Sequence, residues 1–123
     1  MDNAAPTIAI VDDDEIVRRA LGRLLATLSY RPVEFESGEA FVSTLERQRP
    51  DCVLLDLHMP GLDGLGVLRR TREASPGVPV IMITAVDQEG VSESCIAAGA
   101  RDCLLKPLSR EALHLAIQSA LRA

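Results

Sequence analysis

Short runs of consecutive apolar residues recur along the chain, and amphipathic segments separate them. The clearest runs cover residues 8–11, 53–55, 80–83 and 103–105. Strands that are covered on both faces have continuous apolar runs, whereas strands with one wetted face alternate between apolar and polar residues. Strands that alternate with helices form a parallel sheet between helical layers, joined by right-handed crossovers. The sequence therefore predicts an α/β fold: a (βα)5 doubly wound, five-stranded parallel sheet.

Apolar residues three and four positions apart mark the intervening helices. Residues 31–35 contain Pro32, which cannot donate to a sheet ladder, so this segment is predicted to be an edge strand. Ser37 and Ser109 stand where helices are expected to begin. The helix that starts at 87–90 is the weakest, because Gly90 lowers helix propensity. The residues predicted to face inward from the helices are Val17, Leu21, Leu24, Leu28, Phe41, Leu45, Leu65, Leu68, Val91, Cys95, Ala98, Leu113, Ile117 and Leu121.

Length and composition exclude several classes of protein. A chain of 123 residues fits one domain, expected at 7–123 after a short arm at 1–6. The formal charge of −5 argues against direct contact with nucleic acid. No apolar stretch approaches the roughly 20 residues that span a bilayer. The three cysteines follow no disulfide or zinc pattern, which favours a cytoplasmic location.

Polar residues stand at the ends of four of the five predicted strands. Asp12 and Asp13 follow the first strand, Asp56 the third, Thr84 the fourth and Lys106 the fifth. In open parallel sheets, ligands bind beyond the carboxyl ends of the strands. Carboxylates suit a hard cation such as Mg²⁺, while lysine and threonine can bind phosphoryl oxygens. The pattern predicts a site for a divalent cation and a phosphoryl group.

Each of these residues alone also has a purely structural interpretation. The neighbouring Asp14 or Glu15 is well explained as a cap or first-turn residue of the first helix. Asp56 alone is as readily a loop cap as a functional acid. Lysines are mostly solvated, and threonine is an ordinary strand residue. It is the joint occurrence at four strand ends that favours a functional site.

Four motifs, in chain order, resemble those of the receiver domains of two-component response regulators. The motifs are the acids Asp12 and Asp13, the segment 56–64 (D-L-H-M-P-G-L-D-G), the pair Thr84-Ala85 and the pair Lys106-Pro107. The resemblance extends over practically the whole chain. The expected strand order is the flavodoxin-like 2-1-3-4-5.

The resemblance implies that Asp56 accepts a phosphoryl group from a sensor histidine kinase. The Mg²⁺ ligands that it implies are Asp13, Asp56, the main-chain carbonyl of His58 and, through water, Asp12. The residues that it places around the phosphoryl oxygens are Lys106 and Thr84, with Ala85 beside them. The chemistry agrees, since a carboxylate can attack phosphohistidine in line while a metal and a lysine neutralise charge.

Further residues tune or relay this chemistry in the family. Positions two beyond the acceptor and two beyond the threonine set the rate of self-catalysed hydrolysis; here these are His58 and Val86, although His58 also has the simpler interpretation of a polar loop residue. Pro107 is expected to follow a cis peptide bond. Cys103 stands where many receivers carry an aromatic switch residue, so the signal is expected to leave through the fourth helix and its preceding loop. A buried apolar role for Cys103 is favoured over redox sensing.

The final helix reaches Ala123 without a stop signal, so an output domain is expected beyond it. The chain loosely resembles receivers that precede a helix-turn-helix DNA-binding domain, which implies transcription regulation as the output. The resemblance also implies that the fourth helix, fifth strand and fifth helix form a homodimer face. A stand-alone regulator that acts through protein contacts is the rival interpretation.

Two other classes share parts of the pattern. An aspartyl-nucleophile phosphohydrolase needs a second acid two residues after the nucleophile, where this chain has His58, so enzyme activity is not expected. A flavin-binding domain would share the strand order, but four consecutive acids from Asp12 would repel the flavin phosphate.

Overall fold

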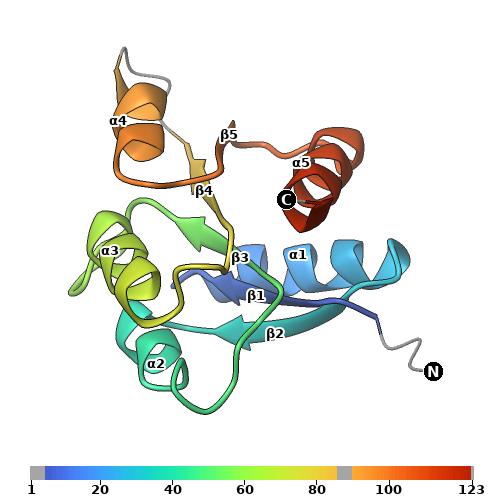
Figure 1. Ribbon diagram of the computed structural model, residues 1–123. Coiled ribbons are helices and arrows are strands. Elements are labelled where there is room, and N and C mark those ends of the chain that lie inside the picture. The colour runs from blue at the N-terminus through green and yellow to red at the C-terminus, as the bar shows by residue number, and fades with distance from the viewer. Residues whose placement is uncertain (1–4, 86–89, 123) are drawn as a thin grey trace.

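The computed structural model describes residues 5–85 and 90–122. Within these residues a five-stranded sheet has the order β2-β1-β3-β4-β5, and all neighbouring strands are parallel (Figure 1). The strands are β1 (Thr7–Val11), β2 (Arg31–Phe35), β3 (Cys52–Asp56), β4 (Val80–Thr84) and β5 (Asp102–Leu105). The predicted (βα)5 fold, its strand order and the edge position of β2 are confirmed.

Two layers of helices cover the sheet (Figure 1). The helices are α1 (Glu15–Thr27), α2 (Gly38–Val42), α3 (Gly64–Ala74), α4 (Val91–Ala97) and α5 (Arg110–Arg122). Side chains of α1 and α5 pack on one face, and those of α2, α3 and α4 pack on the other. Among the described residues, no helix has both the length and the apolar character needed to cross a membrane.

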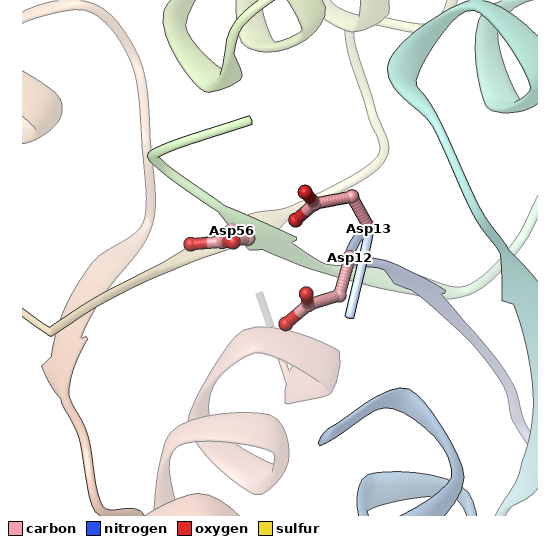
Figure 2. A group of neighbouring side chains, drawn as sticks. All are labelled: Asp12, Asp13 and Asp56. Carbon is pink, nitrogen blue, oxygen red and sulfur yellow. The ribbon is translucent and has the colours of Figure 1, made fainter. Parts of the chain in front are cut away.

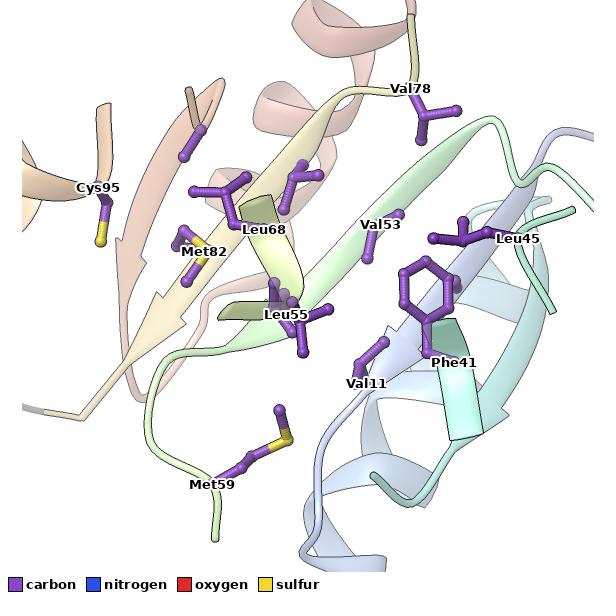
Figure 3. Close-up of a cluster of buried hydrophobic side chains, with 14 residues drawn as sticks. Val11, Phe41, Leu45, Val53, Leu55, Met59, Leu68, Val78, Met82 and Cys95 are labelled. Atoms are coloured by element: carbon purple, nitrogen blue, oxygen red, sulfur yellow. The ribbon is translucent and has the colours of Figure 1, made fainter. Parts of the chain in front are cut away.

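Strands β1, β3, β4 and β5 contribute to both cores because successive side chains point to opposite faces of the sheet. In β1, Ile8 and Ile10 join the cluster under α1 and α5, whereas Ala9 and Val11 join the cluster under α2, α3 and α4. Figure 3 shows the second cluster, in which Phe41 of α2 is buried. Burial on both faces explains why the strands read as unbroken apolar runs in the sequence.

The buried stripe of α1 differs in part from the predicted one. Leu21 is buried as predicted, but the most deeply buried side chain is Leu25, which the spacing did not single out. Leu24 is only half-buried, and Leu28 lies at the C-cap, beyond the last helical residue. Because Leu21 and Leu25 lie one helical turn apart, the core contact is centred to one side of the predicted stripe.

Short polar side chains cap the start of four helices, α1, α2, α3 and α5, and Asp63 caps α3. Asp14 Oδ1 accepts a hydrogen bond from the Ile16 N–H (2.9 Å), Ser37 Oγ from the Ala40 N–H (3.0 Å) and Ser109 Oγ from the Ala112 N–H (3.0 Å). Each bond satisfies a donor that the helix leaves unpaired. Asp14 is therefore a capping residue, as one of its two interpretations proposed, and Asp12 and Asp13 need another explanation.

Glycines flank α4 on both sides. Gly90 precedes it in the left-handed conformation (φ 89°), and Gly99 follows it with φ 111°. Gly99 ends the helix as predicted, because glycine adopts positive φ without a steric penalty. The predicted start of this helix at 87–89 and the predicted tuning residue Val86 lie outside the described residues.

Candidate functional site

Three carboxylates meet at the carboxyl ends of β1 and β3. Asp12 and Asp13 follow β1, Asp56 ends β3, and the two strands are direct neighbours in the sheet. One carboxylate oxygen from each residue lies within 4.8 Å of the others (Figure 2). Asp12 and Asp56 are 2% and 7% exposed, whereas Asp13 is exposed. Residues 43 positions apart in the chain thus form one acidic cluster.

Lys106 joins this cluster from β5. Its Nζ lies 3.6 Å from Asp12 Oδ2 and 3.9 Å from Asp56 Oδ1. The pleat explains the convergence, since side chains two residues apart point to the same face. An aliphatic side chain of the core under α1 and α5 stands two residues before each of the three polar residues. The pairs are Ile10 and Asp12, Leu54 and Asp56, and Leu104 and Lys106. The three polar side chains therefore lie on the same face of the sheet as that core, just beyond its last apolar residues.

Main-chain donors hold two of the carboxylates in place. The Asp14 N–H donates to Asp12 Oδ1 (2.9 Å), and the His58 N–H donates to Asp56 Oδ1 (3.3 Å). These bonds fix one oxygen of each acid against its own following turn. The side-chain torsions of both buried acids are thereby restricted.

Burial raises the pKa of Asp56, and the nearby Asp12 carboxylate raises it further. Lys106 and the His58 N–H act in the opposite direction but do not offset the rise. Three acids beside one ammonium group leave an excess of negative charge in a small volume. An all-oxygen donor set of this kind fits Mg²⁺, which prefers carboxylate, carbonyl and water ligands.

Thr84 and Ala85 lie at the same edge of the sheet. Thr84 ends β4, is buried, and accepts the Lys106 N–H at its main-chain oxygen (2.8 Å). By the pleat, its side chain belongs to the face of Met82, which is opposite to the face of Lys106. Thr84 therefore approaches the sheet edge from the α4 side. The Lys106–Pro107 peptide bond is cis, as the resemblance implied.

The loop after β3 depends on a residue that the sequence did not single out. Glu39 of α2 accepts the Leu62 N–H at Oε2 (3.1 Å), and main-chain N–H groups, those of Glu39 itself and Leu62, lower its pKa. Gly61 has φ 74°, and a Cβ there would lie 2.9 Å from Glu39 Oε2. The exposed His58 is carried by this loop. No local signal indicates Glu39, because it lies 23 residues from its partner.

Cys103 is half-buried and packs against the core that contains Cys95 of α4. Burial, followed by the nearby Cys95 thiol, raises the pKa of Cys103 to about 11. A thiol with a raised pKa carries little of the reactive thiolate at neutral pH. These observations favour the apolar role over the redox role.

A family model identifies the family of this chain. The model of the response regulator receiver domain matches residues 8–118. The chain belongs to this family. It is a receiver domain of two-component response regulators, and phosphorylation and Mg²⁺ binding are general properties of such domains.

Similar proteins agree with this membership. The receiver domain is 37% identical over 115 residues to a probable transcriptional regulator, ycf27, of Porphyridium aerugineum, covering 94% of this chain and 48% of that protein. It is 36% identical over 116 residues to a cyclic di-GMP phosphodiesterase of Thermotoga maritima, covering 94% of this chain and 31% of that protein. The chain therefore spans about half or less of the length of these relatives.

Among solved structures, a CheX–CheY–BeF3–Mg²⁺ complex from Borrelia burgdorferi superposes with a TM-score of 0.86 at 28% identity. The alignment covers 92% of this chain and 87% of that chain. Family membership supports the signalling interpretation. The phosphodiesterase activity named for the Thermotoga maritima protein belongs to a chain more than three times as long as the matched part.

Proposed function

We propose that Asp56 accepts a phosphoryl group from a sensor histidine kinase. The observation that carries this proposal is the position of its carboxylate, which is buried, lies within 4.8 Å of two other carboxylates and is 3.9 Å from Lys106 Nζ. Asp12 is less suited than Asp56 to act as the nucleophile. Asp12 already engages one oxygen with the Asp14 N–H and the other with Lys106.

The free oxygen of Asp56 supports its role as the nucleophile. Among the described residues, the hydrogen bond from His58 and the ion pair with Lys106 both reach Oδ1. This leaves Oδ2 available to attack phosphorus. Because only the ionised carboxylate is a nucleophile, the acceptor needs cationic neighbours that oppose its raised pKa.

The residues that would hold Mg²⁺ are Asp13, Asp56, the main-chain carbonyl of His58 and, through water, Asp12. When bound, the ion would neutralise charge on the phosphoryl oxygens. The Lys106 ammonium would bind one phosphoryl oxygen, and the Thr84 hydroxyl and the Ala85 N–H would donate to others. His58 and Val86, which stand two positions after Asp56 and two positions after Thr84, would tune the hydrolysis of the acyl phosphate.

A groove beside Lys106 supports the assignment of the kinase as partner. Ile16 at the start of α1 is 82% exposed. It lines the groove together with Val17, Ala20, Leu21, Lys106, Pro107 and Leu108. An apolar helix face of the kinase could lie here and present its phosphohistidine to Asp56. The free thiols of Cys52, Cys95 and Cys103 suit the reducing cytoplasm, which is the location that we propose.

For the output we propose homodimerisation through α4, β5 and α5, coupled to transcription regulation by a domain outside this chain. The names of the relatives support regulation of transcription. Ile96 of α4 and Leu105 of β5 are each nearly half exposed, so this face carries apolar side chains that a partner can cover. Cys103, which packs against the core that contains Cys95 of α4, would relay the state of Thr84 by packing rather than by an aromatic swing.

The test is incubation with Mg²⁺ and acetyl phosphate, followed by mass spectrometry under conditions that preserve acyl phosphates. Wild-type protein should gain one phosphoryl group that acid removes, and Asp56→Asn should gain none. Asp51→Asn is the matched control, because Asp51 lies just before the opposite end of β3. Equal labelling of wild type and Asp56→Asn would refute the proposal.

A further inference from the structure

Strand β2 adds no side chain to the acidic cluster, but it is connected to the cluster through Arg18 of α1. The Arg18 NH1 group donates to the main-chain oxygen of Asp12 (2.8 Å), and Nε lies 3.3 Å from Glu34 Oε1 of β2. The Arg18 side chain is only 12% exposed and that of Glu34 is 38% exposed. One guanidinium group therefore joins α1, the end of β1 and β2.

The Asp12 main chain is held on both sides by this arrangement. Its N–H donates to the Phe35 carbonyl (3.2 Å), and its carbonyl accepts from Arg18. Gly22, one turn after Arg18, leaves room for Glu34, since a Cβ there would lie 3.3 Å from Glu34 Oε2. Packing of α1 thus leaves space for the carboxylate that orients the arginine.

We infer that Arg18 is a positioning residue for the Mg²⁺ site, oriented by Glu34 and acting through the peptide unit between Asp12 and Asp13. This inference rests on the proposed function. The Asp12 carbonyl and the Asp13 N–H belong to one rigid plane, so a bond that fixes the carbonyl also fixes the direction in which both acids leave the main chain. A planar, two-pronged guanidinium suits this task, because it can donate to the carbonyl and to Glu34 at once.

Removal of Arg18 would change Mg²⁺ affinity through its charge and through its positioning role, and the two effects have opposite directions. Arg18 is a cation near a cation-binding site, so the loss of its charge would strengthen Mg²⁺ binding. The loss of positioning would weaken it, because groups that orient metal ligands typically contribute about 10–100-fold to metal affinity. The direction of the change therefore separates the two effects.

The experiment compares Arg18→Ala, Arg18→Lys and Glu34→Gln with wild type. The control is Arg19→Ala, because Arg19 is the next residue of the same helix and its ion pair with Glu15 (2.8 Å) is exposed. The Mg²⁺ dissociation constant is measured by calorimetry at a temperature where urea titrations show each variant to be folded. The initial rate of phosphorylation by acetyl phosphate is measured below Mg²⁺ saturation.

We expect Mg²⁺ affinity to fall about tenfold in Arg18→Ala, with the phosphorylation rate falling in parallel and recovering at high Mg²⁺. Arg18→Lys should also bind Mg²⁺ more weakly despite its retained charge, and Arg19→Ala should match wild type. Unchanged or tighter binding in Arg18→Ala would overturn the inference; if that variant does not fold, an unchanged affinity in Glu34→Gln would do so. Wild-type protein that is phosphorylated and binds Mg²⁺ upholds the proposed function in either case, and wild-type protein that does neither refutes it.

Discussion

Replacing Asp56 with asparagine is expected to stabilise the metal-free protein, because it removes a buried charge that lies between two like charges. The carboxylates of Asp12 and Asp13 lie within 4.8 Å of that of Asp56, and Lys106 Nζ lies 3.9 Å from it. At an effective dielectric constant of about 20, each repulsion amounts to about 3.5 kcal/mol and the attraction to about 4 kcal/mol. Screening of the exposed Asp13 lowers the net repulsion, so we expect a gain of about 2 kcal/mol in the free energy of unfolding.

The pH dependence of this gain follows from the raised pKa of Asp56. A pKa that is higher in the folded state means that the stability linked to the group is present at low pH and is lost as the pH rises through that pKa. The gain in the free energy of unfolding of Asp56→Asn over wild type should therefore vanish at a pH well below the ordinary aspartate pKa of about 4, and it should grow as the pH rises above that value. Saturating Mg²⁺ should reduce this gain by stabilising wild type, since a ligand at 100 times its dissociation constant stabilises the folded protein by about 2.7 kcal/mol.

The assay is urea unfolding followed by circular dichroism, in EDTA and in saturating Mg²⁺, at pH 7 and at the lowest pH where the protein stays folded. Asp51→Asn serves as the control for loss of an acid elsewhere. An Asp56→Asn variant that is no more stable than wild type in EDTA at pH 7 would show that the cluster is not repulsive. The electrostatic account of the site would then be wrong.

Three further predictions concern packing and the loop after β3. Gly64→Ala should lower the free energy of unfolding by about 1–3 kcal/mol, because its Cβ would lie 2.6 Å from the Leu57 Cα, whereas Gly77→Ala has open space and should cost little in urea titrations. Leu25→Ala should cost about 2–5 kcal/mol and Leu28→Ala clearly less, and equal costs would contradict the position of the α1 core. His58→Ala should change the lifetime of the phosphorylated form, measured by loss of the label, and an unchanged lifetime would remove its tuning role.

The composition of the acidic cluster could be predicted without the structure because it depends on strand ends alone. In a parallel sheet all carboxyl ends lie at one edge, so residues that follow separate strands become neighbours. Asp12, Asp56 and Lys106 were predicted on this basis, and the distances between their side chains agree. The unbroken apolar runs likewise predicted burial on both faces, which is typical of the parallel sheets to which the edge rule applies.

The side-chain contacts that hold the cluster in place could not be predicted in the same way. Arg18 and Glu34 are 16 residues apart, and Glu39 and Leu62 are 23 residues apart. Each pair meets only after a helix has packed against the sheet with a particular rotation about its axis. The same rotation decides that Leu25, rather than Leu24, is fully buried.

The sequence by itself determined the alternating α/β fold and the acids and lysine at the sheet edge, because hydrophobic periodicity and residue type at strand ends are local properties. The strand order was implied by the resemblance to receiver domains. The tertiary structure alone decided that Thr84 approaches from the opposite face to Lys106, that Cys103 packs beside Cys95, and that Arg18 holds the Asp12 main chain. These contacts depend on the face of the sheet to which each side chain points and on the rotation of each helix about its own axis. Both are decided only when helices pack on the two faces of the sheet.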